Sequence, residues 1–193
     1  MAAGNFRALM DQFDANGFRS NVGIILTRGD GSLLLGGRMG QAGWQFPQGG
    51  MHVGESPLEA MYRELNEEVG LGTGDVELLG QTQDWLHYTL PERFVRKDRS
   101  PVCIGQKQRW FLLRLDAPDS AVNLAASDTP EFDRWRWVDY WRPVKEVVHF
   151  KRRVYVSALN ELAPLVFDDA VPPQPRWWPK EWLADPHRPV QEV

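Results

Sequence analysis

The chain has little cysteine and histidine, and it has no long apolar run. A single cysteine, Cys103, excludes an internal disulfide and suits a reducing, cytoplasmic location. Because Val102 and Ile104 flank it, we expect a buried structural thiol. The four histidines form no cluster with it, so no zinc site is predicted. No apolar run of about 18 residues and no signal-peptide core is present, so we expect no membrane association.

The chain also lacks an excess of positive charge. Its net charge of −4 is not that of a general nucleic-acid coating protein, and DNA is not an expected partner. RNA is not excluded, because one segment is locally basic. The basic residues of that segment are Arg93, Arg96, Lys97, Arg99, Lys107 and Arg109. Such a local patch can steer a polyanion toward a nearby site.

The patterns along the chain predict an α/β protein. Strands are expected at 21–27 and 32–35, joined by a turn at 29–31, and at 76–82, 85–90, 108–115 and 134–138. A turn-like connection is expected over 141–146 and a helix over 151–162. Hydrophobic content of 42% and charged content of 25% are ordinary for a globular domain.

Residues 49–71 are the most informative stretch. Ser56 and Pro57 are typical of a helix start, and Gly70 is typical of a helix end. Within this helix Glu64, Glu67 and Glu68 share an arc of roughly 100°. The neighbouring arc holds the apolar residues expected to dock the helix, namely Leu58, Met61, Leu65 and Val69.

Three clustered carboxylates repel one another unless a cation lies among them. An oxygen-only ligand set favours Mg²⁺, with Mn²⁺ as a substitute, over zinc. The alternative is a solvated acidic helix face. The sharp helix ends and the preceding Gly49–Gly50 loop, whose backbone can approach a phosphate or a metal, favour a site.

The same stretch reads G-x5-E-x7-R-E-L-x-E-E-x-G-L, and it resembles the Nudix box of hydrolases that cleave nucleoside diphosphates linked to another moiety. Segments outside the box resemble the bacterial RNA pyrophosphohydrolase branch, also described as diadenosine polyphosphate hydrolases. These segments are 18–23, 44–50, 101–108, 129–133 and 150–152. The resemblance covers roughly residues 17 to 165. It implies a Nudix fold, a mixed β-sheet sandwiched between α-helices.

The resemblance and the change in composition near residue 168 together predict a division of the chain. Residues 1–16 form an N-terminal extension, 17–167 the hydrolase domain, and 168–193 a tail rich in proline and tryptophan. In that tail we expect Trp177, Trp178 and Trp182 to pack on the domain or on a partner.

The resemblance implies a role for each residue that matches a functional position. The Gly49 carbonyl, Glu64, Glu67, Glu68 and Glu131 are the implied metal ligands, and either Glu64 or Glu131 is the base that takes the proton of water. Arg63 is expected to orient a carboxylate, the alternative being a surface pair with Glu59 or Glu67. We interpret Glu55 as a helix-cap acceptor.

Lys151 is the implied contact of the 5′-phosphates, and Phe150 is expected to stack on a base. A cation at a helix start is unfavourable unless an anion binds there. Arg19 and Arg38 match arginines that contact phosphate or RNA.

These assignments predict a cytoplasmic, monomeric, Mg²⁺-dependent RNA 5′ pyrophosphohydrolase, with a protein regulator allowed. It would convert 5′-triphosphate or diphosphate mRNA to the 5′-monophosphate form and so trigger decay. The first alternative is a dinucleoside polyphosphate hydrolase. The second is a catalytically silent nucleotide- or RNA-binding Nudix module, which the complete set of box glutamates disfavours.

Overall fold

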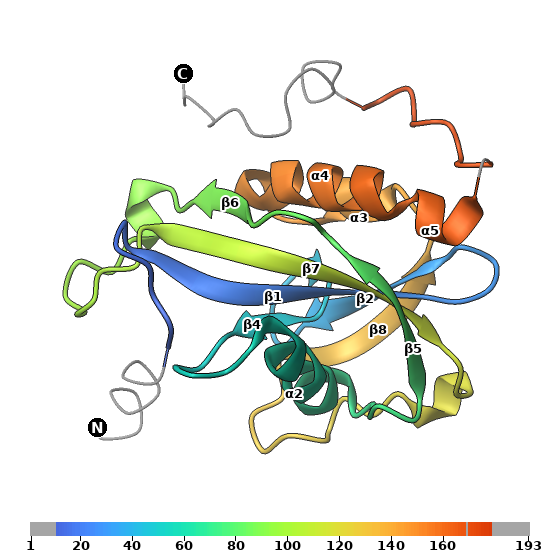
Figure 1. The fold of residues 1–193 in the computed structure, drawn as a ribbon, viewed down its shortest axis with the longest axis horizontal. Helices are drawn as coiled ribbons and strands as arrows, with labels where there is room; N and C mark the ends of the chain where they lie inside the picture. Colours follow the sequence, from blue (N-terminus) through green and yellow to red (C-terminus); the bar gives the residue numbers. More distant parts are fainter. Residues whose placement is uncertain (1–10, 169, 179–193) are drawn as a thin grey trace.

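An eight-stranded mixed β-sheet organises the computed structural model, which describes residues 11–168 and 170–178. The elements in chain order are β1 (Phe18–Thr27), β2 (Leu33–Arg38), β3 (Trp44–Gln45), β4 (Gln48–Gly50), α2 (Pro57–Val69), β5 (Val76–Gln81), β6 (Leu86–Thr89), η1 (Glu92–Phe94), β7 (Gly105–Leu115), η2 (Asp119–Ala121), β8 (Phe132–Val138), α3 (Arg142–Glu146), η3 (His149–Lys151), α4 (Arg152–Leu162) and α5 (Pro164–Phe167). Helix α2 covers one face of the sheet, and α3, α4 and α5 cover the other (Figure 1). The predicted α/β sandwich is confirmed.

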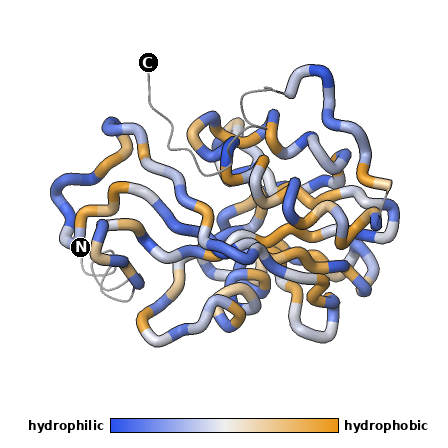
Figure 2. Tube along the Cα trace, turned by 45° about the horizontal axis from the view of Figure 1, so that its top comes forward, coloured by the Kyte–Doolittle hydropathy of each residue, from blue (hydrophilic) through white to orange (hydrophobic). Residues whose placement is uncertain are grey.

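Strand β1 is the centre of the sheet. It runs parallel to β7 and antiparallel to β2 and β4, while β5 and β6 pair antiparallel with β7. Alternate β1 side chains enter two cores because successive side chains of a strand point to opposite faces. Ile24 and Leu26 pack in the core under α2, and Ile25 packs in the core under α3 and α4. Hydrophobic residues accordingly follow the central strands, while hydrophilic residues follow the outer loops (Figure 2).

Local signals explain where α2 begins and ends. The Ser56 hydroxyl accepts from the Glu59 amide and the Glu59 carboxylate accepts from the Ser56 amide, which completes a capping box. Gly70 closes the helix in the left-handed conformation at φ 72°. The predicted docking face was wrong at Leu58, whose exposed fraction is 43%. Ala60, one turn ahead of Glu64, is buried instead.

Two further expectations were wrong. The connection predicted as turn-like is the helix α3, which begins at Arg142 and has Pro143 in its first turn. Cys103 is only partly buried, and its thiol donates to the Gly105 carbonyl oxygen at 3.2 Å. The flanking apolar residues do not bury it, because Val102 is itself exposed.

The tail returns to the domain at Trp178, as predicted. Its ring lies 5.1 Å from that of Trp141, and only 6% of Trp178 is exposed, whereas Trp177 is exposed. The Trp141 indole donates to the Pro172 carbonyl at 2.9 Å. Trp182 and residues 1–10 lie outside the described residues, and the division of the chain at residues 16 and 168 stays a prediction.

We expect Trp178→Ala to lower the free energy of unfolding by about 2–4 kcal/mol, because it removes a large buried side chain and leaves a cavity beside Trp141. Trp177→Ala is the matched control and should cost less than about 1 kcal/mol. Urea denaturation of both variants measures the difference. Equal losses would mean that the tail does not brace the domain through Trp178.

No helix within the described ranges has the length and apolar character needed to cross a membrane.

Candidate functional site

The site begins where the loop carrying β4 meets α2. The Gln48 amide donates to Glu68 Oε2 at 2.9 Å, which ties the loop to the helix. A Cβ added at Gly49 would lie 1.8 Å from Glu64 Cδ, so only glycine allows this approach. Pairing of β4 with β1 fixes the loop in turn. The structure thus brings Gly49, Glu64 and Glu68 together.

Arg63 links the loop to the helix carboxylates. Its Nε donates to Glu55 Oε1 at 2.7 Å, its Nη1 to Glu64 Oε1 at 2.7 Å, and its Nη2 to the Gly50 carbonyl at 2.7 Å. Burial alone would lower the pKa of Arg63, but the hydrogen bonds to Glu55 and Glu64 outweigh burial and raise it. A longer contact of 3.5 Å reaches Glu67. These contacts can hold the Glu64 carboxylate in one orientation.

The expectation that Glu55 caps the helix was wrong. Ser56 is the cap, and Glu55 instead accepts two hydrogen bonds from Arg63 and one from the His52 amide at 2.9 Å. Burial would raise the pKa of Glu55, but the Arg63 hydrogen bond and the His52 amide lower it. Glu55 therefore stays ionised and braces Arg63.

Two helix carboxylates are buried. Burial, more than any neighbouring charge, raises the pKa of Glu64 and raises that of Glu68 well above its ordinary value. The charge of Glu131 raises the pKa of Glu68 further. Glu68 Oε1 is buried, and no hydrogen-bond partner for it is found among the residues that the structure describes. A buried carboxylate oxygen without a hydrogen-bond partner is well suited to coordinate a cation.

Glu131 and Lys151 reach this place from distant elements. Glu131 lies in the loop before β8, close enough for its charge to raise the pKa of Glu68. Lys151 stands at the start of α4 and is 8% exposed. Burial and the positive charge of Arg38 lower the pKa of Lys151 to about 8, although Glu131 and Glu68 act to raise it.

Lys151 is a buried cation without an ion pair in the part of the chain that the structure describes. Its ammonium lies 5.7 Å from the centre of the Tyr88 ring. Because it shares the surroundings of Glu68, Glu131 and Arg38, it can meet an anion that binds there.

The remaining predicted substrate contacts flank this centre. Arg19 pairs with Asp11 at 2.7 Å and lies against Gly50, where an added Cβ would come within 2.0 Å of its Nη2. Phe150 packs against Tyr88, with ring centroids 5.7 Å apart. Arg38 is exposed at the end of β2. The roles of all these residues stay predictions.

The donor set suits a hard divalent cation. Glu64, Glu67, Glu68, Glu131 and the Gly49 carbonyl offer only oxygen, which Mg²⁺ and Mn²⁺ prefer. A cation bound among these carboxylates would give Glu68 Oε1 a partner and would offset the repulsion between Glu68 and Glu131. Within residues 11–168 and 170–178, no group of three or more acidic, histidine or cysteine side chains is arranged so that it could hold a metal ion by itself.

Two contributing residues were missed by sequence reasoning. The Tyr155 hydroxyl accepts from the Phe46 amide at 3.0 Å and so ties α4 to the loop before Gly49. Tyr88 joins Phe150 to Lys151. Both are aromatic residues in ordinary helix or strand patterns, and no sequence signal separates them from core residues.

Comparison with known proteins agrees with this fold. The Escherichia coli dihydroneopterin triphosphate pyrophosphohydrolase superposes with a TM-score of 0.59 at 18% identity, covering 73% of this chain and 95% of that one. A Caenorhabditis elegans Ap4A hydrolase complex superposes with a TM-score of 0.50 at 21% identity, covering 71% and 92%. At such identities the likeness concerns the fold alone.

The family follows from the sequence matches. The model of the NUDIX domain matches residues 17–158, and the chain belongs to the Nudix hydrolase family. An RNA pyrophosphohydrolase of Alkalilimnicola ehrlichii is 58% identical over 162 residues, covering 84% of this chain and 90% of the relative. An RNA pyrophosphohydrolase of Proteus mirabilis is 58% identical over 153 residues, covering 79% and 87%.

Proposed function

We propose that this chain is an RNA 5′ pyrophosphohydrolase that uses Mg²⁺, with Mn²⁺ as a substitute. It converts 5′-triphosphate or diphosphate RNA to 5′-monophosphate RNA in the cytoplasm. The observation that carries the proposal is the meeting of Glu68, Glu131 and Lys151 from three separate elements. The relatives named RNA pyrophosphohydrolase support RNA as the substrate.

Each residue has a physical role in this proposal. The Gly49 carbonyl, Glu64, Glu67, Glu68 and Glu131 would hold the metal, which supplies charge neutralisation on the phosphates and a more acidic water. Arg63 holds Glu64 in place through its 2.7 Å contact. Glu64 or Glu131 accepts the proton of the attacking water.

The substrate residues act on the anion and on the base. Lys151 and Arg38 would neutralise the 5′-phosphates. The proposal for this pair is supported by their proximity, because the charge of Arg38 lowers the pKa of Lys151, on which Glu131 and Glu68 also act. Phe150 offers its ring to a base, and Arg19 lies against Gly50 in the loop before α2.

A paired substrate assay tests this proposal against the dinucleotide alternative. The kcat/KM of the purified protein with Mg²⁺ is measured for a short 5′-triphosphorylated RNA and for diadenosine tetraphosphate, with product identification. We expect the RNA to be preferred by about tenfold or more, a difference of about 1.4 kcal/mol. A preference for the dinucleotide would favour the alternative enzyme, and no turnover of either by folded protein would favour the silent module.

We expect Lys151→Met to separate stability from activity. Methionine has similar length and removes a buried charge, so the free energy of unfolding should rise by about 1 kcal/mol or more. The kcat/KM for triphosphorylated RNA should fall by about 10²-fold, because one preorganised phosphate contact is lost. Urea denaturation and steady-state kinetics measure the two effects.

Lys145→Met is the control for this substitution, because Lys145 is exposed on α3. It should change neither quantity noticeably. Wild-type activity of the Lys151→Met enzyme would mean that Lys151 does not bind the 5′-phosphates.

A further inference from the structure

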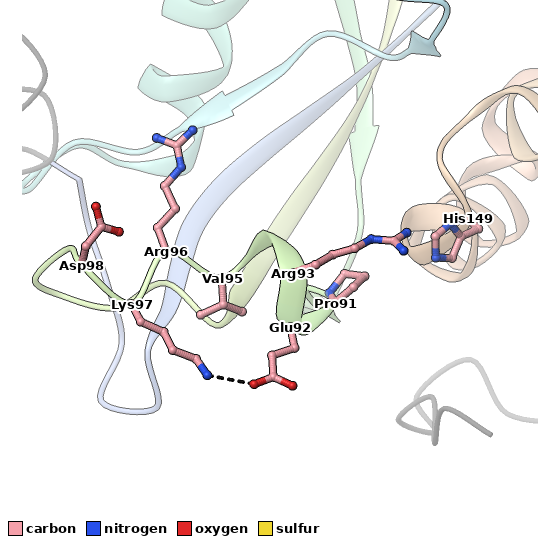
Figure 3. Close-up of a pocket in the computed structure, with 8 residues that line it drawn as sticks. All are labelled: Pro91, Glu92, Arg93, Val95, Arg96, Lys97, Asp98 and His149. Carbon is pink, nitrogen blue, oxygen red and sulfur yellow. Dashed lines mark hydrogen bonds and ion pairs between the residues drawn. The ribbon is translucent and has the colours of Figure 1, made fainter.

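An open hollow of about 950 Å³ lies beside η1 (Figure 3). It is lined by Pro91, Glu92, Arg93, Val95, Arg96, Lys97, Asp98 and His149. His149 directly precedes Phe150 and Lys151 in the chain, and the ring of Phe94 lies 5.6 Å from that of Phe150. The hollow therefore lies close to Phe150, the residue proposed to stack on a base of the substrate.

Two arginines and one aspartate of this hollow, Arg93, Arg96 and Asp98, make no ion pair in the described part of the chain, which leaves one net positive charge. Lys97 pairs with Glu92 at 2.8 Å. Neither Arg93 nor Arg96 has an ion pair among residues 11–168 and 170–178, and Arg93 extends toward His149 in Figure 3. A guanidinium group without an ion pair can bind a phosphate.

Aromatic rings connect the hollow to the candidate site. Phe94 is 47% exposed, and the Arg93 guanidinium lies 5.0 Å from the centre of its ring. Phe94, Phe150 and Tyr88 follow one another with centroid separations of 5.6 and 5.7 Å. Cationic groups that track a backbone, combined with exposed rings on which bases stack, are how proteins bind single-stranded nucleic acid.

We propose that this hollow binds the nucleotides that follow the 5′ end of a single-stranded RNA. Arg93 and Arg96 contact their phosphodiesters, and Phe94 provides a stacking surface for a base. This inference rests on the proposed function. It also gives the site a means of preferring RNA, because a dinucleoside polyphosphate has no downstream phosphodiester to occupy the hollow.

Substrate length tests the inference. The KM of the full-length protein is measured for a 5′-triphosphorylated dinucleotide and octanucleotide, at several salt concentrations. For the wild-type protein we expect an about tenfold lower KM for the octanucleotide. The double variant Arg93→Gln/Arg96→Gln should lose this advantage, and the slope of log KM against log salt should fall by about 1.4, about 0.7 per phosphate contact.

Arg114→Gln is the control for charge, because Arg114 is exposed near the end of β7 opposite to the hollow and pairs with Glu77 and Asp116. This variant should keep the lower KM for the octanucleotide and the wild-type slope of log KM against log salt. Retention of that advantage by the double variant would overturn the inference while leaving the proposed function intact.

Direct binding decides the inference independently of turnover. The affinity for an octanucleotide with a 5′-monophosphate, followed by fluorescence anisotropy, should fall by about tenfold in the double variant. Equal affinities in the two proteins would overturn the inference even if no RNA is hydrolysed. Absence of hydrolysis together with the weaker affinity of the double variant would instead count against the proposed reaction.

Discussion

Glu68→Gln is expected to lower kcat for 5′-triphosphorylated RNA by about 10³-fold or more while the protein stays folded. Glutamine preserves the shape of the side chain and its acceptor for the Gln48 amide, but it removes the negative charge. The lost charge belongs to the most buried carboxylate of the site, at 4% exposure. Steady-state kinetics with purified protein and Mg²⁺ measures the loss.

The same substitution should not destabilise the metal-free protein. Burial raises the pKa of Glu68 in the folded state. A carboxyl whose pKa is raised on folding contributes stability at low pH, and that contribution is lost as the pH rises above the unfolded pKa. At neutral pH the ionised Glu68 is therefore unfavourable, and glutamine should leave the free energy of unfolding unchanged or raise it.

Glu59→Gln is the matched control on the same helix. Glu59 is exposed, and glutamine can replace glutamate in a capping box. Activity of this variant should equal that of the wild type. If Glu68→Gln were as active as Glu59→Gln, Glu68 would not be part of the catalytic site.

Gly49→Ala is expected to lower activity by about 10²-fold or more and the free energy of unfolding by about 1–3 kcal/mol. The new methyl carbon would overlap Glu64 Cδ, which it would approach to 1.8 Å. Glu64 cannot easily move aside, because it is buried and Arg63 holds it at 2.7 Å. Kinetics and urea denaturation measure the two losses.

Gly29→Ala is the control, because nothing lies within 4 Å of a Cβ at Gly29. It should leave activity unchanged. Full activity of Gly49→Ala would contradict the close approach of Gly49 to the Glu64 carboxylate on α2.

The sequence was most informative where local signals act alone. Ser56, Pro57 and Gly70 defined α2 to within a residue, because capping depends on neighbouring residues only. Leu58 was misassigned because its exposure depends on what packs against the first turn of the helix. The short helix α3 was missed because five residues give no periodicity to detect.

The site residues also differ in how far the sequence alone predicts them. The helical spacing of Glu64, Glu67 and Glu68 follows from the geometry of one helix. Glu131 and Lys151 were predicted only from the family resemblance, because no pattern within one sequence reveals that β8 and α4 bring them beside Glu68. The hydrogen bond between Arg63 and Glu55 depends on how the loop before α2 folds back onto the helix. The sequence does not reveal that contact, and Glu55 was therefore wrongly predicted to cap the helix.

The most direct test of the central claim is the fate of a 5′-triphosphorylated RNA incubated with purified protein and Mg²⁺. The account predicts 5′-monophosphate RNA with release of pyrophosphate or phosphate, inhibition by a chelator, and no product with Glu68→Gln. Triphosphorylated RNA left unchanged by folded wild-type protein, or converted equally by Glu68→Gln, would contradict it.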